Sequence, residues 1–303
     1  MYDLISVGTI SIDLYFKGKN FTFKDNRFTL AVGGKYVADH FDFKIGGGGA
    51  NVAIGVANHG FQSAVIGKIG NNPFKKVILD YLKTRHVATN LIDEEDNYSN
   101  LSTILLTKKG ERTIIHYATP HQHLFSSNNP LFGLTKTKII YLGNLPDVSL
   151  TQRIKFLKFI GKHRITRILN LGVSDCRRPK HQLKEILEQT DILIVNGYEF
   201  SDIVKASHKD IHFHEDVISW YIPNLFEKIV VVTEGEKGSF AYFKGKVFYQ
   251  PALKPAQIID TTGAGDAYTA GFISGFLKSQ NIEIAMKKGA TYASHILAKI
   301  GAN

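Results

Sequence analysis

Two carboxylates enclose a run of small residues near the end of the chain, in the sequence Asp260-Thr-Thr-Gly-Ala-Gly-Asp266. Glycine lets a backbone approach an anion closely, and the start of a helix offers free N–H groups and the positive end of a dipole. Asp266 on such a first turn could take a proton from a hydroxyl that attacks the anion. This layout suits phosphoryl transfer; the alternative is that Asp266 is a plain N-terminal cap.

A second glycine run, Gly46-Gly-Gly-Gly-Ala-Asn51, opens a predicted helix with an apolar stripe. The backbone there could crowd a small polar ligand, and the Asn51 amide offers donors and acceptors to hydroxyl groups. The alternative is a tight turn with close helix–sheet packing. The run does not match the dinucleotide-binding GxGxxG pattern, and no strand-terminal acid follows at the expected distance, so we exclude a dehydrogenase.

Asp13 follows the first predicted strand, at the carboxyl end, where open α/β sheets bind ligands. Its carboxylate could accept two hydrogen bonds from a vicinal diol, or it could be an ordinary surface aspartate. Asn196 and Glu199 end a later apolar strand and share a helical face. They could hold Mg²⁺ through waters beside phosphates, or form a capping pair.

A further strand runs into a turn with two glycines in Thr233-Glu-Gly-Glu-Lys-Gly238. Thr233 and Gly235 there could approach a nucleotide phosphate or ribose. A single pattern of this kind is weak evidence by itself.

Short apolar runs alternate with helical patterns along the chain, which predicts a parallel sheet in an α/β fold. The predicted strands are 4–8, 63–69, 138–142, 167–170, 192–196 and 229–233, with a hairpin through Lys244-Gly245. The predicted helices are 49–59, 75–85, 150–163, 181–189, 201–206, 218–221, 265–279 and 282–299.

Two segments interrupt this alternation and have strand-like patterns, 14–45 and 98–118. We expect them to pair into a small β-sheet that covers a cleft, although they could be two separate surface hairpins. The α/β core then comprises residues 1–13, 46–97 and 119–303. Arg112, on a lid strand, either reaches a substrate or faces solvent, and we favour solvent.

The composition limits the class of protein. The 303 residues include 37 Lys and Arg against 27 Asp and Glu, a net charge of +10 that favours anionic ligands. The basic residues form no block, and no nucleic-acid-binding motif occurs, so we expect no nucleic-acid partner. No apolar run is long enough to span a membrane. The single cysteine, Cys176, excludes an internal disulfide and is compatible with a cytoplasmic location.

In their order along the chain, these motifs resemble the ribokinase-like, or PfkB-type, carbohydrate kinase family. The resemblance covers essentially the whole chain and rests on Asp13, Gly46–Asn51, Asn196–Glu199, Thr233–Gly238 and Asp260–Asp266, the last matched residue for residue. It implies a three-layer α/β/α sandwich with a mainly parallel central sheet and a small β-sheet lid. Ribokinases usually have a lysine where this chain has Gly48, and a glutamate where the nearest candidate is Asn144, which weakens ribose as the substrate.

The resemblance also implies roles. Asp266 would be the general base, and the anion hole would consist of the N–H groups of Gly263, Ala264, Gly265 and Asp266. The acceptor would contact Asp13, Gly47, Gly48, Asn51 and Asn144. ATP would lie against Thr233, Gly235, Gly238, Asn196 and Glu199. Glu199 would hold Mg²⁺ through water, and a monovalent cation such as K⁺ would bind Asp260 and Thr262.

The expected reaction is transfer of the γ-phosphoryl group of ATP to a hydroxyl of a small sugar. A nucleoside kinase of the same fold remains an alternative, because aromatic residues of the lid could stack on a base. A non-catalytic regulator that binds a sugar or nucleotide is a third possibility, which the intact Asp266 disfavours. Exposed lid strands would permit a homodimer.

Overall fold

The computed structural model describes residues 1–25, 27–107, 111–120, 134–299 and 301–303. Its core is a nine-stranded sheet whose strands β15 to β8 are parallel, whereas β16 and β17 form an antiparallel edge. The strands, in spatial order, are β17 (Lys246–Gln250), β16 (Ser239–Phe243), β15 (Ile229–Thr233), β14 (Ile192–Asn196), β13 (Thr166–Leu169), β12 (Thr137–Leu142), β1 (Tyr2–Val7), β6 (Ser63–Ile66) and β8 (Val87–Ala88).

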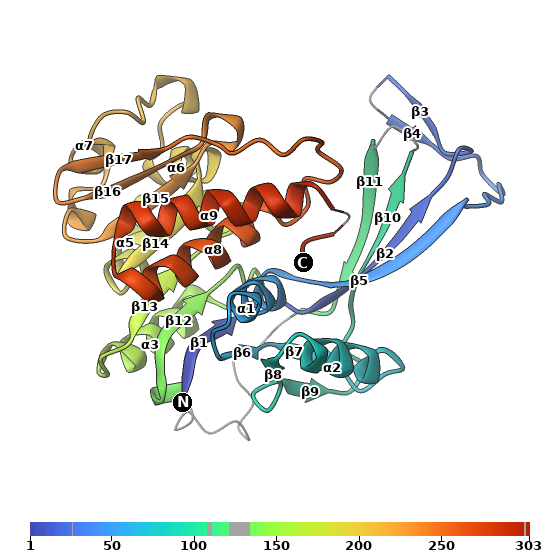
Figure 1. Cartoon of the computed structure of the whole chain (residues 1–303), viewed down its shortest axis with the longest axis horizontal. Helices are drawn as coiled ribbons and strands as arrows, with labels where there is room; N and C mark the ends of the chain where they lie inside the picture. Colours follow the sequence, from blue (N-terminus) through green and yellow to red (C-terminus); the bar gives the residue numbers. More distant parts are fainter. Residues whose placement is uncertain (26, 108–110, 121–133, 300) are drawn as a thin grey trace.

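Helices cover both faces of this sheet (Figure 1) because successive strand residues point to opposite sides. In β1, Leu4 packs with α1, α8 and α9, whereas Ile5 packs with α3, α5 and α6 on the other face. The helices are α1 (Gly48–Asn58), α2 (Phe74–Thr84), α3 (Leu150–Gly161), α4 (Val173–Cys176), α5 (Lys180–Glu188), α6 (Gly197–Val204), α7 (Val217–Tyr221), α8 (Ala264–Ser279) and α9 (Ile282–Leu297). The predicted three-layer sandwich is confirmed.

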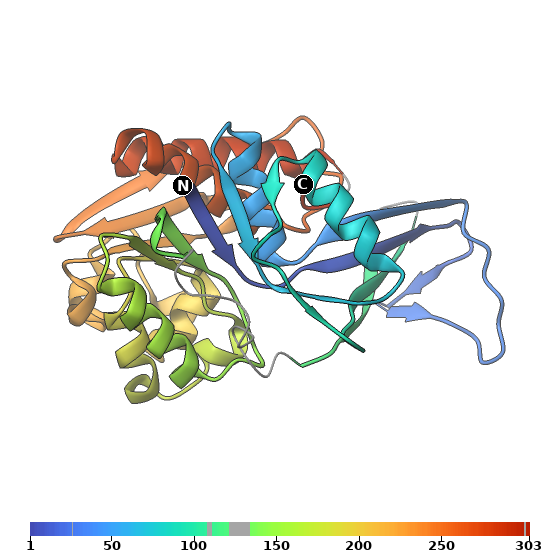
Figure 2. The same cartoon turned by 90° about the horizontal axis from the view of Figure 1, so that it is seen from below.

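A second sheet projects from the core as a lid (Figures 1 and 2). Its order is β11 (Arg112–Ala118), β10 (Asn100–Leu106), β2 (Ser11–Lys17) and β5 (His40–Gly46). The two strand-like segments therefore pair with each other, through the parallel contact between β10 and β2. We had expected Asp13 to follow the first core strand directly. The lid sheet begins at Ser11, however, so Asp13 lies within the lid strand β2.

Smaller strands complete the fold: β3 (Thr22–Lys24) pairs with β4 (Arg27–Thr29), and β7 (Lys68–Gly70) with β9 (Asp93–Glu95). The strand predicted over 63–69 is divided at Gly67, where a side chain would lie 2.5 Å from the Gly8 carbonyl oxygen. The predicted hairpin is confirmed, with Lys244 and Gly245 both at positive φ.

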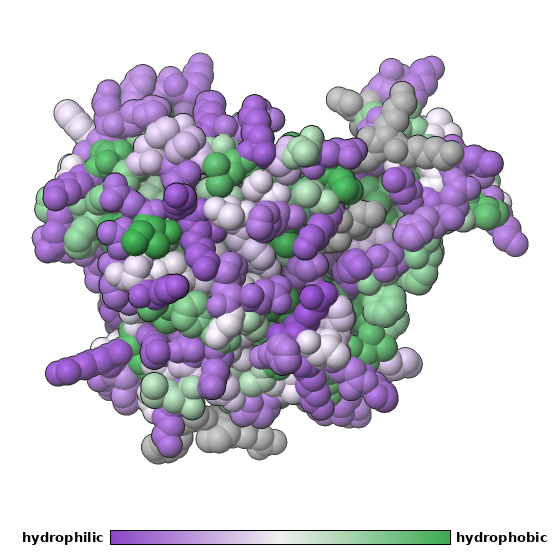
Figure 3. Space-filling model, viewed as in Figure 1, coloured by the Kyte–Doolittle hydropathy of each residue, from purple (hydrophilic) through white to green (hydrophobic). Residues whose placement is uncertain are grey.

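The surface seen in Figure 3 is largely hydrophilic, with hydrophobic residues in small patches. Among the described helices, none is both long and apolar enough to cross a bilayer.

Candidate active site

The first turn of α8 and its N-cap carry the glycine-rich sequence Gly263–Asp266. Gly263 is its N-cap and has φ 75°, a conformation that costs little only for glycine. Helical hydrogen bonding begins with the Ala267 N–H, which donates to the Gly263 carbonyl oxygen at 2.8 Å. Within the described structure, the N–H groups of Gly265 and Asp266 donate to no backbone carbonyl. The helix therefore presents free amide donors beside Asp266.

Asp266 lies between the two glycine-rich motifs. Its Oδ2 accepts a hydrogen bond from Asn51 Nδ2 at 2.8 Å, and a side chain on Gly48 would lie 3.6 Å from its Oδ1. Burial raises the pKa of the Asp266 carboxyl, and the bond from Asn51 lowers it. The structure thus brings a carboxylate of raised basicity to the start of α8, next to the turn that precedes α1.

A cavity of about 340 Å³ opens beside Asp266, between the core and the lid. Of the predicted acceptor residues, Gly47, Gly48 and Asn144 line it. Sequence reasoning missed its other lining residues, which are Thr9, Ser11, Asn100, His116, Ala118, Tyr141, Pro146, Asp147 and Asn170. For Asn170 a signal existed, because it is the last residue of a predicted strand, at the carboxyl edge of the sheet. For the lid residues no such local signal exists.

Asp13 and Asn51 stand just behind this lining. The Asp13 carboxylate accepts a hydrogen bond from Ser11 Oγ at 3.3 Å, and burial raises the pKa of its carboxyl. Asn51 contacts Asp266 directly, and its Oδ1 accepts a hydrogen bond from Asn303 Nδ2 at 3.0 Å. The structure therefore places both residues next to this cavity.

A second cavity, of about 290 Å³, lies on the other side of the α8 N-terminus. The predicted nucleotide residues Thr233, Gly235 and Gly238 line it, together with Ala264 and Gly265. Its remaining lining is mostly apolar and comes largely from α8, α9 and the segment after β17, including Leu253, Ile258, Tyr268, Ala290, Ala293 and Leu297. A flat apolar base with a phosphate tail directed at the amides of α8 would suit such a cavity.

Asn196 and Glu199 line neither of these cavities. They form a reciprocal capping box at α6, in which Glu199 N–H donates to Asn196 Oδ1 and Asn196 N–H donates to Glu199 Oε2, both at 2.9 Å. Burial raises the pKa of Glu199. Asn196 pairs in register with Thr233, so the box lies at the same sheet edge as the second cavity. Carboxylate and amide oxygens at this edge fit a Mg²⁺ ion held through water.

Asp260, at the start of the loop that leads into α8, is buried and heavily hydrogen-bonded. Its Oδ1 accepts from the Thr262 N–H at 2.9 Å, and its Oδ2 from the Gly301 N–H at 3.1 Å. Arg112 Nη1 approaches Oδ1 at 3.2 Å, so the expectation that Arg112 simply faces solvent is wrong, although 33% of its side chain is exposed. Thr262 Oγ1 is buried without a hydrogen-bond partner among the described residues.

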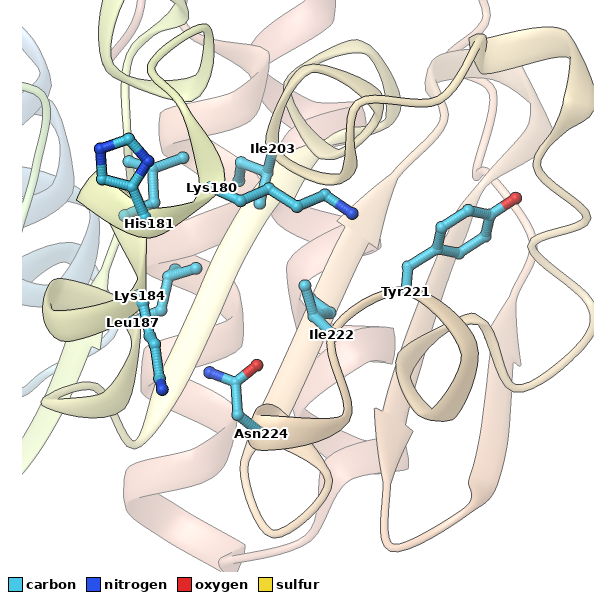
Figure 4. A pocket seen from close by; sticks show the side chains of 9 residues that line it. Lys180, His181, Lys184, Leu187, Ile203, Tyr221, Ile222 and Asn224 are labelled. Atoms are coloured by element: carbon cyan, nitrogen blue, oxygen red, sulfur yellow. The ribbon is translucent and has the colours of Figure 1, made fainter.

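A third hollow, of about 290 Å³, lies among α5, α6 and α7 (Figure 4). Leucine and isoleucine side chains form part of its wall, and Lys180, His181 and Lys184 come from one helix at its rim. It belongs to the helical layer opposite α8 and α9, and none of the predicted site residues lines it. It is therefore separate from the candidate site.

Comparison with known proteins places this arrangement in a family. The model of the pfkB family of carbohydrate kinases matches residues 1–303. The chain is 27% identical to a 5-dehydro-2-deoxygluconokinase of Geobacillus thermodenitrificans, over 98% of this chain and 87% of the relative. It is 26% identical to a nucleoside kinase of Methanocaldococcus jannaschii, over 99% and 92%.

Among solved structures, the Arabidopsis thaliana ribokinase complexed with ribose and ATP superposes with a TM-score of 0.80, at 24% identity, covering 99% of this chain and 94% of that one. Two cavities meet at the glycine-rich start of α8. The family model matches the whole length, so this chain belongs to the pfkB family of carbohydrate kinases.

Proposed function

We propose that the protein transfers the γ-phosphoryl group of ATP to a hydroxyl of a small, uncharged sugar. The observation that carries this proposal is the meeting of two cavities at one helix start. Asp266 lines the cavity under the lid, whereas Ala264 and Gly265 line the apolar cavity on the other side. A phosphoryl group at the amides of this turn would lie between its donor and its acceptor.

In this mechanism, Asp266 orients the acceptor hydroxyl and takes its proton, a contribution of about 10²–10⁴-fold in rate. The N–H groups of Gly263, Ala264, Gly265 and Asp266 stabilise the charge on the transferred group, and losing one such donor costs on the order of 10²–10³-fold. Mg²⁺, when bound through Glu199 and Asn196, supplies charge neutralisation at the phosphates. The lid excludes water, which competes with the sugar as acceptor.

The charge of the acceptor cavity favours an uncharged substrate. Its described lining contains the carboxyl groups of Asp147 and Asp266 and the amides of Asn100, Asn144 and Asn170, but no lysine or arginine. A phosphorylated or acidic sugar would face carboxylates without a compensating cation. Hydroxyl groups, in contrast, can donate to the carboxylates and exchange hydrogen bonds with the amides.

A nucleoside is the second candidate acceptor. It is also uncharged and carries the vicinal hydroxyls that Asp13 could bind, and one whole-length relative is named a nucleoside kinase. A non-catalytic regulator is the third candidate, although the burial and hydrogen bonding of Asp266 suit a working base.

The decisive experiment is a coupled ADP-release assay with a panel of hexoses, pentoses, nucleosides, sugar acids and sugar phosphates. We expect turnover with an uncharged acceptor. Asp266→Asn should bind ATP normally and lose about 10²-fold or more in kcat, whereas Asp80→Asn, on α2 outside both cavities, should not. ATP binding without ADP release from any panel member would support the regulator, and undiminished turnover by Asp266→Asn would remove the base assignment.

We also propose that two copies pair through their lids. The lid face turned away from the acceptor cavity carries exposed apolar side chains, namely Phe41 (54% exposed), Phe43 (44%), Ile115 (60%) and Tyr117 (59%). The strand register brings these alternate residues to one face of the sheet. A clustered apolar face of this kind favours burial against a partner.

A further inference from the structure

The lid and the loop that leads into α8 are joined by Arg112, the first residue of β11. Its Nη1 lies 3.2 Å from Asp260 Oδ1, and its Nη2 donates to Thr261 Oγ1 at 2.9 Å. Arg112 shares its face of β11 with His116 and Ala118, because alternate residues point to the same side. Both of these residues line the acceptor cavity. One strand therefore lines the acceptor cavity and also contacts the loop that leads into α8.

Asp260 is where this loop meets the lid and the C-terminal turn. The carboxylate receives N–H groups from Thr262, within the loop, and from Gly301, after α9. Its side chain is only 4% exposed. A carboxylate this deeply buried needs a positive partner, because an isolated buried charge is very costly. The identity of that partner decides what holds the loop in shape.

A monovalent cation such as K⁺, which the family resemblance implies here, fits this arrangement poorly. The described donors around the Asp260 carboxylate are two N–H groups and a guanidinium, all of which present positive hydrogens toward it. Lys44 of β5 also packs beside Gly301 and pairs with Asp42 at 2.9 Å. The buried Thr262 Oγ1, which has no hydrogen-bond partner among the described residues, is a further oxygen in this loop. A second cation would therefore be repelled while Arg112 occupies its place.

We propose that Arg112 is the resident cation of this loop: a lid-borne positioning residue that neutralises Asp260 in place of a free monovalent ion. A guanidinium is permanently charged and has directed donors, so it can bind Asp260 and Thr261 together. Because this cation belongs to a strand that also lines the acceptor cavity, the shape of the loop depends on the position of the lid. The lid and the phosphate-binding loop are thereby coupled through Arg112.

The test compares K⁺ with tetramethylammonium at matched ionic strength, and it rests on the proposed kinase activity for its kinetic part. We expect wild-type kcat to change by less than about twofold between the two salts. Arg112→Ala should lose on the order of 10²-fold in kcat, as expected for a damaged anion hole, with a smaller change in acceptor KM. K⁺ or added guanidinium should restore kcat at least severalfold in this variant, and Arg112→Lys should fall in between.

A second measurement does not depend on turnover. The Tm of the free protein should be the same in both salts for wild type, whereas K⁺ should raise the Tm of Arg112→Ala. Lys17→Ala, which removes a cation from a neighbouring lid strand, is the matched control and should behave as wild type. A wild-type protein that requires K⁺ for activity and gains Tm from it would overturn the proposal, as would an Arg112→Ala variant with normal kcat. Absence of any kinase activity in the wild-type protein would contradict the proposed function. The Tm comparison would still test whether Arg112 takes the place of a monovalent cation.

Discussion

The environment of Asp266 reconciles two opposed requirements of a general base. Burial favours the protonated form and raises the pKa, whereas the hydrogen bond from Asn51 Nδ2 favours the carboxylate and lowers it. Asn51 is itself held by Asn303, whose Oδ1 accepts a hydrogen bond from the Tyr81 hydroxyl at 2.7 Å. Burial thus makes the carboxylate more basic, and the bond from Asn51 supports the ionised form that accepts a proton from an alcohol.

This balance predicts a pH dependence. kcat/KM should fall as the pH drops through the pKa of Asp266, because the protonated carboxyl cannot accept the hydroxyl proton. Asn51→Ala removes the bond that lowers this pKa, so the pKa rises further and the acid limb should move to higher pH. Measuring kcat/KM against pH for both proteins checks this. An acid limb that stays in place in Asn51→Ala would show that another group controls it.

At the scale of single residues, the sequence allowed candidate site residues to be proposed where they lie in local motifs. Gly263–Asp266 and Gly46–Asn51 were found because a single stretch of chain carries both the glycines and the polar side chain. Arg112 was misjudged because its partner, Asp260, is 148 positions away and no local pattern joins them. His116 was missed for the same reason, since the lid's position over the cavity decides its role.

At the scale of elements, the start of α6 shows that the Asn196–Glu199 motif has a structural role as a helix cap in addition to the proposed Mg²⁺ role. The sequence predicted a helix over 201–206 and left two interpretations of Asn196 and Glu199, as Mg²⁺ ligands through water or as a capping pair. In the structure the helix begins at Gly197, and these two residues cap it. Most other predicted boundaries agree with the structure within one or two residues, because apolar periodicity marks where an element is buried.

A buried ion pair between elements supports a stability prediction. Arg153 of α3 is fully buried, and its Nη1 donates to Asp175 Oδ2 of α4 at 2.6 Å. Its Nε and Nη2 have no partner among the described residues, whereas the other oxygen of Asp175 accepts from Arg178 Nε at 2.9 Å. Loss of Asp175 would therefore leave Arg153 as an unpaired buried charge.

Asp175→Asn should lower the free energy of unfolding by about 3–5 kcal/mol, the usual cost of breaking a buried pair. Arg153→Met should cost less, because Asp175 keeps Arg178 and the methionine fills much of the volume. Urea unfolding of both variants, with equal m-values required, measures the difference. A larger loss in Arg153→Met than in Asp175→Asn would contradict this assignment of the uncompensated charge.

At the scale of the whole molecule, the lid joins segments that are distant in sequence, since β10 follows β2 by more than eighty positions and yet pairs with it in parallel. Strand propensity predicted that both segments are extended. One face of the lid covers the acceptor cavity and the other is exposed. The way the sheet joins the core decides which face is which, and no local sequence pattern specifies that junction. The exposed apolar face formed by Phe41, Phe43, Ile115 and Tyr117 became visible only with the register.

That face predicts self-association. In a symmetric dimer each substitution counts twice, because both copies use the same surface. Phe41→Ser with Ile115→Ser should weaken dimerisation by on the order of tenfold or more, which is about 1.4 kcal/mol, without reaching the acceptor cavity. Val32→Ser removes a fully exposed apolar side chain outside the lid sheet and serves as the control. Sedimentation equilibrium over a range of concentrations measures the constants, and a wild-type protein that stays monomeric at high micromolar concentration would show that this face has another purpose.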